Sequence, residues 1–178
     1  GRNYIHCNTC IEEFDRHDVN SVSIFGDTLY QKLRTDGHNQ DFLHFSDLPE
    51  FIVYHGRCFT IRGQKTYVGT MCEKGGLDGL GLSLESSLNS VSSMIRQEVP
   101  LLLTFHSAAI AIKFYKRTDA YYVFDSHSRG SDGLCCPDGT AVVTVFHSLE
   151  NICLFLRNLC VSLNRTIPLE KVQYELCL

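Results

Sequence analysis

The first apolar pattern along the chain has the spacing of a helix. Starting from Asp18, apolar residues recur every three or four positions and a glycine follows the last of them: Val19, Val22, Phe25, Leu29, Leu33 and then Gly37. Residues with this spacing line one face of an α-helix, and a glycine just beyond them commonly ends it. The pattern therefore predicts a helix of about 17 residues that begins at Asp18.

The next apolar runs are short and have strand character. They are rich in β-branched and aromatic residues and are parted by turn residues such as His55-Gly56; the runs are 51–54, 57–62 and 66–70. Such runs predict two or three short strands. The glycine-rich segment 75–81 follows them, and it lacks the Gly-x-x-x-x-Gly-Lys motif of a phosphate-binding loop. We expect a flexible loop there.

Two further helices are predicted downstream, each preceded by a serine. Serine is a preferred N-cap residue because its hydroxyl accepts a hydrogen bond from a free N–H of the first turn. Ser83 precedes a helix that we expect to run to about Arg96, with Leu84, Leu88, Val91 and Ile95 on one face. Ser148 precedes a second helix, whose apolar face contains Leu149, Ile152, Cys153, Leu156 and Leu159.

Between and after these helices lie the remaining predicted strands. They are apolar or aromatic runs separated by polar turns, at 101–105, 108–115, 120–124 and 141–146, with 172–178 as a returning edge strand. Consecutive runs of this kind are typical of a largely antiparallel sheet. The sequence therefore predicts an α+β fold in which helices pack against a central sheet of about five or more strands. We expect residues 1–178 to form a single domain, because this length suits one hydrophobic core.

Composition and charge narrow the range of functions. The 178 residues carry a net charge of −4, and basic residues are not interleaved with aromatic ones in any run. A nucleic-acid partner is therefore not expected. The longest apolar stretches, 100–105 and 108–112, are far shorter than the roughly 20 residues that span a bilayer, and the first residues lack the apolar core of a signal peptide. We expect a soluble chain that does not use a membrane as partner.

The cysteines indicate a reducing environment. There are nine, which is an odd number, and their spacing does not resemble a disulfide framework. Cys153 and Cys160 fall on the apolar stripe of a predicted helix, where free cysteine is common. We therefore expect an intracellular location in the cytoplasm, with the nucleus also open to such a chain.

The candidate chemistry lies in Asp125-Ser126-His127, which directly follows the apolar run 120–124. Side chains two residues apart on a strand point to the same side, so Asp125 and His127 can meet. An imidazole in this setting can act as a general base while the carboxylate orients it, and a cysteine thiolate is the obvious missing nucleophile. The alternative is that Asp125 and Ser126 are ordinary turn residues at a strand exit.

Three segments of the chain resemble a known family. Residues 122–130, followed by 137–141, look like the catalytic Asp-x-His segment of herpesvirus tegument-type ubiquitin-specific cysteine peptidases. Gly26-Asp27-Thr28-Leu29-Tyr30 is similar to a helix of that family, and residues 83–88 resemble its next helix. The three segments occur in the family's order, and the resemblance covers roughly residues 19–163.

The resemblance implies a papain-like cysteine peptidase that acts on ubiquitin or polyubiquitin chains. Members of the family are thiol proteases that hydrolyse the isopeptide or peptide bond after the C-terminal glycine of ubiquitin. No cofactor or metal is implied. By position the nucleophile would be Cys7, with Cys10 as second choice, while His127 would be the general base and Asp125 would orient it.

Other functions stay open at this point. In the family a glutamine precedes the nucleophile and a second one upstream forms the oxyanion hole, whereas Cys7 follows His6 and the first glutamine is Gln31. A module of the same fold that binds ubiquitin or another protein without cleaving it is therefore the second hypothesis. Acyl transfer of the transglutaminase type by the same residues is a third.

The Cys7-Cys10 pair, His106 and Arg129 each have an interpretation that does not involve catalysis. The Cys7-x-x-Cys10 pair could supply half of a zinc site, completed by His6 or by Cys135 and Cys136. His106 falls between two predicted strands, where we expect it in a hairpin turn. Arg129, just after the Asp-x-His segment, could stabilise the loop after the strand or contact the substrate tail, but we expect a surface arginine.

Overall fold

The computed structural model describes residues 16–35, 48–63, 65–72, 82–106 and 108–178, with residues 16–19 and 34 described by their backbone alone. Its helices are α1 (Arg16–Thr35), α2 (Leu84–Ser92), α3 (Leu149–Leu163) and a 3₁₀ turn at Leu169–Lys171. Its strands are β1 (Phe51–Tyr54), β2 (Arg57–Thr60), β3 (Thr66–Thr70), β4 (Leu82–Ser83), β5 (Glu98–Phe105), β6 (Ala108–Tyr115), β7 (Ala120–Arg129), β8 (Thr140–Phe146) and β9 (Gln173–Cys177).

The strands of the described residues form two sheets. The larger has seven strands in the order β4-β3-β9-β5-β6-β7-β8, and the smaller is the hairpin β1-β2. All paired neighbours are antiparallel except β3 and β4. The predicted α+β fold with a largely antiparallel central sheet is therefore confirmed.

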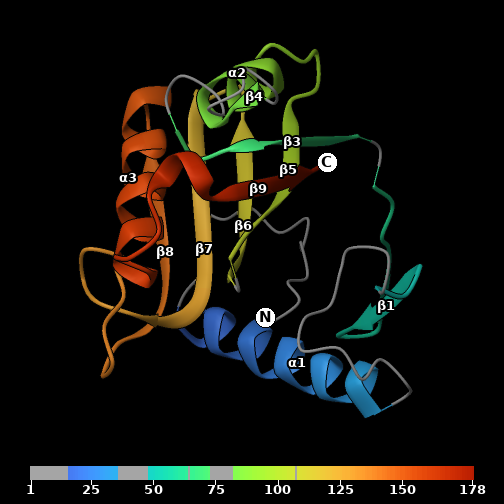
Figure 1. The fold of residues 1–178 in the computed structure, drawn as a ribbon. Helices are drawn as coiled ribbons and strands as arrows, with labels where there is room; N and C mark the ends of the chain where they lie inside the picture. The colour runs from blue at the N-terminus through green and yellow to red at the C-terminus, as the bar shows by residue number, and fades with distance from the viewer. Residues whose placement is uncertain (1–15, 36–47, 64, 73–81, 107) are drawn as a thin grey trace.

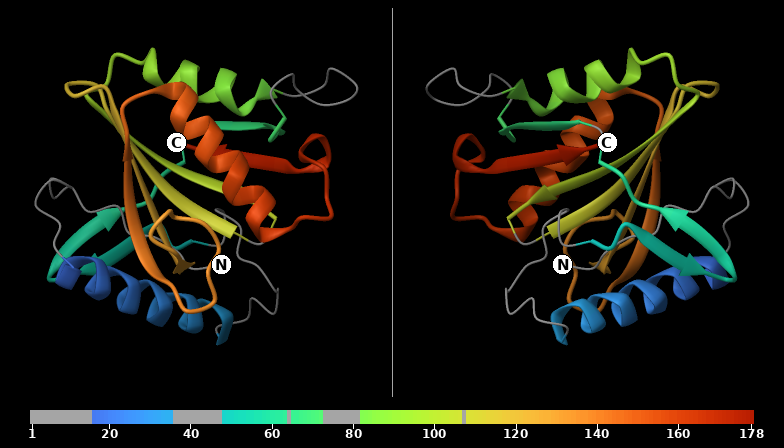
Figure 2. Two further views of the ribbon diagram at one scale, coloured as in Figure 1. Left: turned by 90° about the vertical axis from the view of Figure 1, so that its left-hand side faces the viewer. Right: turned by 90° about the vertical axis from the view of Figure 1, so that its right-hand side faces the viewer.

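One face of the large sheet packs against α2 and α3, which lie side by side over it (Figure 1, Figure 2). Alternate residues along β5 and β6 are buried, as expected for strands with one covered face. They join the apolar stripes of the two helices in one core, whose fully buried members include Leu88, Leu103, Ile110, Ile112, Leu156 and Leu159. Burying each such side chain contributes about 1.5–3 kcal/mol.

Helix α1 packs against the hairpin β1-β2, away from α2 and α3 (Figure 1, Figure 2). The rings of Phe25 and Tyr54 meet edge to face with centroids 4.9 Å apart, and the Tyr54 hydroxyl donates to Ser21 Oγ at 2.9 Å. The hairpin turns at His55-Gly56, where both residues have positive φ. That conformation suits a two-residue turn between twisted strands.

Both predicted serine caps are present. Ser83 Oγ accepts from the backbone N–H of Ser86 at 3.1 Å, and Ser148 Oγ accepts from that of Asn151 at 3.0 Å. The helix predicted from Asp18 is α1, which has 20 residues. His106 lies between β5 and β6 with a positive φ, which agrees with the predicted hairpin turn. Gly37 and the segment 75–81 lie outside the described residues.

The prediction that the second helix runs to about Arg96 is wrong. Helix α2 ends at Ser92, and Ile95 is 92% exposed instead of lying on the buried face. The hydroxyls of Ser92 and Ser93 both donate to the carbonyl of Asn89, at 2.9 and 2.8 Å. Serine side chains that bond nearby carbonyls in this way compete with the helical pattern, which favours an early end.

The prediction of an edge strand at 172–178 is also wrong. Strand β9 lies inside the sheet, with β3 on one side and β5 on the other. Its residues Tyr174 and Leu176 are 2% and 0% exposed. Alternation along a sequence predicts a strand but does not identify its neighbours, because those are set by distant parts of the chain.

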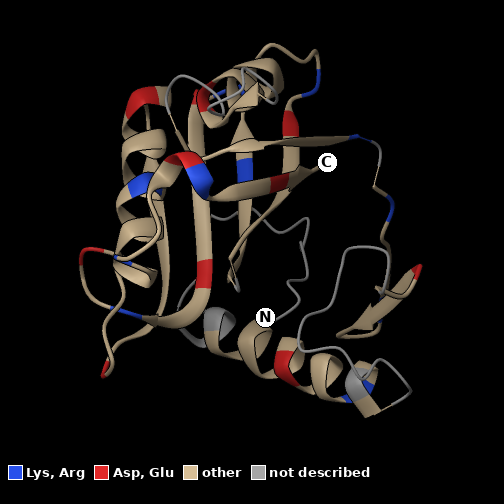
Figure 3. Ribbon diagram, viewed as in Figure 1, with Lys and Arg blue, Asp and Glu red and all other residues tan. Residues whose placement is uncertain are grey.

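Charged residues of both signs are spread over several elements of the ribbon (Figure 3). The described residues contain no helix that is long and apolar enough to cross a membrane. That residues 1–178 form a single domain stays a prediction.

Candidate active site

The candidate site lies on β7, near the end where this strand curves toward residues 130–139 (Figure 1). The strand was predicted to stop at Phe124, but it continues to Arg129. Its pairing with β8 runs regularly to Asp125↔Val142 and resumes at Arg129↔Thr140. Four steps along β7 thus match two steps along β8, so β7 bulges between these pairs. Asp125 and His127 therefore lie within a bent strand and not in a turn after one.

Asp125 and His127 make the predicted contact. His127 Nδ1 lies 2.7 Å from Asp125 Oδ1, and the backbone N–H of His127 donates to the same oxygen at 2.9 Å. An ionised carboxylate can only accept hydrogen bonds, so the ring proton resides on Nδ1. Nε2 is then the nitrogen that can accept a proton. The Asp125 side chain is 1% exposed and that of His127 is 27% exposed, so the imidazole reaches the surface while its partner does not.

The second oxygen of Asp125 is bound by Arg129. Arg129 Nε donates to Asp125 Oδ2 at 2.6 Å, and the two side chains are 2% and 1% exposed. The expectation of a surface arginine is therefore wrong. In a regular strand, residues four apart are separated by about 13 Å. The bend of β7 at its bulge brings the guanidinium back to the carboxylate.

These contacts favour the ionised form of Asp125. Burial acts to raise the pKa of Asp125, whereas the hydrogen bonds from the ring and backbone of His127, together with the charge of Arg129, lower it. The lowering effects prevail, so the pKa of Asp125 lies below its ordinary value. At neutral pH this carboxylate is charged and can stabilise an imidazolium beside it.

The segment after β7 holds the end of the strand in place. Ser128 Oγ donates to the carbonyls of Cys136 and Pro137 at 2.7 and 3.0 Å. A Cβ atom at Gly139 would lie 2.1 Å from the carbonyl oxygen of Arg129, so only glycine fits where the two backbones meet. Arg129 is therefore held by its backbone as well as by its guanidinium.

The two cysteines predicted as nucleophile, Cys7 and Cys10, lie outside the described residues. Within the described part of the chain all seven cysteines are free thiols. Cys153 and Cys160 are buried in the core, and burial raises the pKa of each to about 11, so neither suits a nucleophile. The described residues hold no cluster of three or more possible metal ligands.

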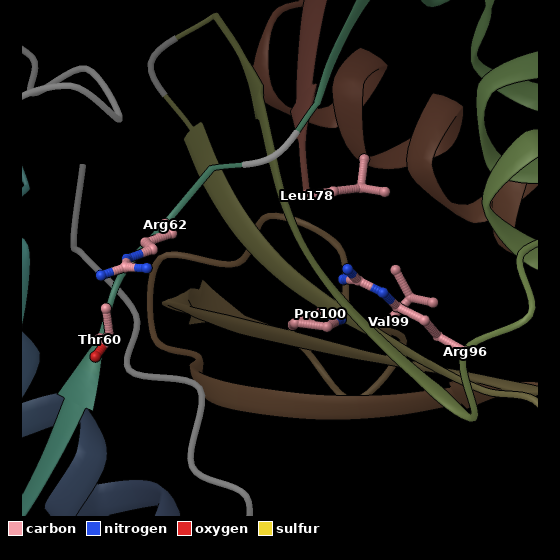
Figure 4. A pocket seen from close by; sticks show the side chains of 6 residues that line it. All are labelled: Thr60, Arg62, Arg96, Val99, Pro100 and Leu178. Atoms are coloured by element: carbon pink, nitrogen blue, oxygen red, sulfur yellow. The ribbon is translucent and has the colours of Figure 1, made fainter.

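A surface hollow of about 370 Å³ lies elsewhere, between the segment after β2 and the start of β5 (Figure 4). Its lining residues are Thr60, Arg62, Arg96, Val99, Pro100 and Leu178. Arg62 also reaches Glu50, at 3.5 Å, in an exposed ion pair. The hollow shares no residue with the cluster of Asp125, His127 and Arg129, so we do not assign it to the same chemistry.

Arg129 is the residue of this cluster that sequence reasoning missed. A usable signal was present, since Arg129 stands an even number of positions after Asp125, which on a strand puts both side chains on one side. This even spacing is informative only if the strand extends past Phe124. The polar run from Asp125 to Arg129 lacks the apolar alternation that would have extended it.

Comparisons with known proteins cover most of the chain. The family model described as herpesvirus tegument protein, N-terminal conserved region, matches residues 4–170, a range that includes Cys7, Asp125 and His127. No match was found among curated protein sequences.

The chain is also similar to a solved structure, the ubiquitin-specific protease encoded by the murine cytomegalovirus tegument protein M48, in complex with a ubiquitin-based suicide substrate. The TM-score is 0.69 at 16% sequence identity, and the match covers 92% of this chain and 66% of that one. This chain thus spans just under two thirds of its structural neighbour. At this identity the likeness establishes the fold, and the predicted papain-like α+β fold is confirmed.

Proposed function

Because the chain belongs to the herpesvirus tegument protein family, through the N-terminal conserved region that matches residues 4–170, we propose that it is a cysteine deubiquitinase. Its reaction would be hydrolysis of the isopeptide bond after the C-terminal glycine of ubiquitin, whether that ubiquitin is attached singly or within a polyubiquitin chain. The similar solved structure is that of a ubiquitin-specific protease, which supports this choice of substrate. The single observation that carries the proposal is the 2.7 Å contact between His127 Nδ1 and Asp125 Oδ1.

In the first half of the proposed reaction, Cys7 acts as nucleophile and His127 as general base. Nε2 of His127 takes the thiol proton, and the thiolate sulfur attacks the carbonyl carbon of the terminal glycine. The carbonyl oxygen becomes an oxyanion in the tetrahedral intermediate. Asp125 stays ionised throughout, keeps the ring proton on Nδ1 and stabilises the imidazolium.

In the second half the imidazolium returns its proton to the leaving lysine amine as the carbon–nitrogen bond breaks. This step leaves the ubiquitin C-terminus as a thioester on Cys7. Water then attacks the thioester carbonyl while His127 again takes a proton, and the Cys7 sulfur leaves as a thiol once the proton is returned to it. Free ubiquitin carboxylate and the unmodified thiol are the products.

The nucleophile is tested with a ubiquitin probe that carries a thiol-reactive C-terminus. Cys7→Ala should abolish covalent capture, while Cys10→Ala should not. One imidazole nitrogen takes the proton of one thiol, so only one of the two cysteines is needed for capture. Cys135→Ser is the matched control, because Cys135 is exposed and its loss should leave capture intact.

Each outcome of the capture experiment has a defined meaning. If Cys10 alone is required, the hydrolase proposal stands and the nucleophile is three residues later than proposed. If neither change affects capture by an active chain, Cys7 and Cys10 are both excluded as nucleophile. If the unmodified chain binds the probe tightly but never forms the covalent bond, the deubiquitinase proposal fails.

The second candidate function is a module that binds ubiquitin or another protein without cleaving it. The observation in its favour is the sequence around Cys7, where His6 takes the place of the family's glutamine. Binding without capture in the same experiment would support this module.

We further propose that the chain works in a reducing compartment, the cytoplasm or the nucleus. A thiolate nucleophile needs a reduced cysteine, and Cys58 and Cys135 are exposed free thiols that an oxidising compartment would modify.

A further inference from the structure

Both carboxylate oxygens of Asp125 are bound, and from different residues. Oδ1 accepts from the ring and the backbone of His127, and Oδ2 accepts from Nε of Arg129 at 2.6 Å. The terminal torsion of an aspartate is soft, so a carboxylate held at one oxygen alone can rotate. With the second oxygen fixed by Arg129, the plane of the carboxylate is fixed too. The direction in which Oδ1 faces the His127 ring then depends on Arg129.

The ion pair is a poor device for stability alone. Its two side chains are 2% and 1% exposed, and removing both charges from water carries a large desolvation cost that their attraction must offset. Arg129 Nη1 donates to the carbonyl of Ser128 at 3.2 Å, but Nη2 is buried with no hydrogen-bond partner in the described part of the chain. An unsatisfied buried donor is a further cost. A role in orienting Asp125 accounts for keeping the pair.

The backbone of Arg129 is held independently of its side chain. It pairs with Thr140 on β8, and it also bridges to Cys135 in the following segment. On another side Gly139 approaches so closely that a Cβ atom there would lie within 2.5 Å of three backbone atoms of Arg129. A guanidinium based on so constrained a backbone has little freedom, which is what orienting a catalytic group to within a fraction of an ångström requires.

We propose that Arg129 is a positioning residue of the active site, which fixes the orientation of the Asp125 carboxylate and, through it, that of the His127 ring. Arg129 touches neither substrate nor nucleophile in this role. The inference rests on the proposed function for its catalytic consequence, while the coupling of Arg129 to Asp125 and His127 can be measured without any turnover.

The test compares Arg129→Gln and Arg129→Lys in the full 178-residue chain. Gln removes both the charge and the planar guanidinium with its several N–H donors. Lys keeps the charge but cannot reproduce the Nε and Nη1 contacts. Hydrolysis of a fluorogenic ubiquitin C-terminal amide should fall about 10–100-fold in kcat for Gln, with KM nearly unchanged, and less for Lys. Arg117→Gln, an exposed arginine at the turn between β6 and β7, is the matched control and should retain normal turnover.

The turnover-independent readout is NMR of the resting chain. In Arg129→Gln the carboxyl ¹³C titration of Asp125 should move to higher pH, because the positive charge of Arg129, which lowers the pKa of Asp125, is absent. The ring ¹⁵N shifts of His127 should show a smaller share of the Nδ1-protonated tautomer. Arg129→Lys should keep the Asp125 titration near normal but show part of the tautomer change.

A third variant approaches Arg129 from its backbone. Gly139→Ala should displace Arg129 without changing any charge, and should lower kcat in the same direction as Arg129→Lys. This variant and Arg129→Lys also keep the test open if Arg129→Gln does not fold. A folded Arg129→Lys or Arg129→Gln chain with normal kcat and an unchanged His127 tautomer would overturn the inference.

Failure of the two proposals can be told apart. If the unmodified chain cleaves no ubiquitin substrate, the deubiquitinase proposal fails, yet the NMR comparison still decides whether Arg129 orients Asp125 and His127. If the chain cleaves normally and the Arg129 variants leave both kcat and the NMR signals unchanged, only the positioning role is refuted.

Discussion

Asp125 and Arg129 form an ion pair with Oδ2 and Nε 2.6 Å apart, and no more than 2% of either side chain is exposed. A pair buried to this degree is sensitive to the loss of one member. The remaining charge stays in the interior without its partner, which is far more costly than the loss of a surface ion pair.

Asp125→Asn should therefore lower the free energy of unfolding by about 3–5 kcal/mol, because it leaves the Arg129 guanidinium buried and uncompensated. The double variant Asp125→Asn/Arg129→Gln should recover most of that loss, since neither charge remains. Urea denaturation of both single variants and the double variant measures this coupling. If the loss in unfolding free energy of the double variant equals the sum of the two single losses, Asp125 and Arg129 are not energetically coupled.

His127→Ala should separate catalysis from binding. Removing the proposed general base should lower kcat by about 10²–10⁴-fold, while ubiquitin affinity stays nearly normal because the imidazole is a small, partly exposed group. The affinity is measured by titration with uncleavable ubiquitin, and kcat with a fluorogenic ubiquitin amide. Unchanged turnover would remove His127 from the mechanism.

Acid should destabilise the chain through Asp125. Its pKa in the folded state is below the ordinary value of about 3.9, so the unfolded chain takes up this proton first as the pH falls. The contribution of Asp125 to the free energy of unfolding is thus complete above about pH 5 and is lost as the pH falls through the folded-state pKa.

The measurement for this acid effect is the free energy of unfolding between about pH 5 and pH 3. It should decrease more steeply in the unmodified chain than in Asp125→Asn/Arg129→Gln, in which the titrating group is absent. Equal slopes in the two proteins would show that Asp125 does not titrate abnormally.

Alkali should destabilise the chain through two core thiols. Cys153 and Cys160 have a pKa of about 11 when folded, because burial disfavours the thiolate, against about 8.5 for an exposed thiol. Stability from these groups is complete below about pH 8.5 and is lost as the pH rises toward 11, by about 3 kcal/mol for each thiol.

Unfolding of the unmodified chain and of Cys153→Ala/Cys160→Ala at pH 8 and at about pH 10.5 measures this difference. The double variant should lose less stability between the two conditions. Iodoacetamide at neutral pH should label Cys58 and Cys135 readily in the folded chain but spare Cys153 and Cys160. Rapid labelling of the two core thiols without unfolding would refute their burial.

The features that sequence predicted well are those with local causes. Ser83 and Ser148 cap their helices because a serine hydroxyl and the first-turn N–H groups are neighbours in the chain. The contact between Asp125 and His127 likewise follows from a spacing of two on a strand.

The features that sequence missed depend on distant partners or on competing local bonds. The interior position of β9 is set by β3 and β5, and the burial of Arg129 by the bulge opposite β8 and by the close approach of Gly139. The early end of α2 reflects the hydroxyls of Ser92 and Ser93, which donate hydrogen bonds to the carbonyl of Asn89. None of these relationships appears as a period in the sequence.

The interior position of β9 has a consequence for how the chain is made. Among the described strands β9 joins β4-β3 to β5-β6-β7-β8, so the sheet stays incomplete while residues 173–177 are still untranslated. A ribosome stalled before Gln173 would hold a nascent chain in which β3 and β5 each lack a strand on one side. Exposed strand edges of this kind recruit other chains, so protection by a chaperone until β9 has paired is the expected requirement.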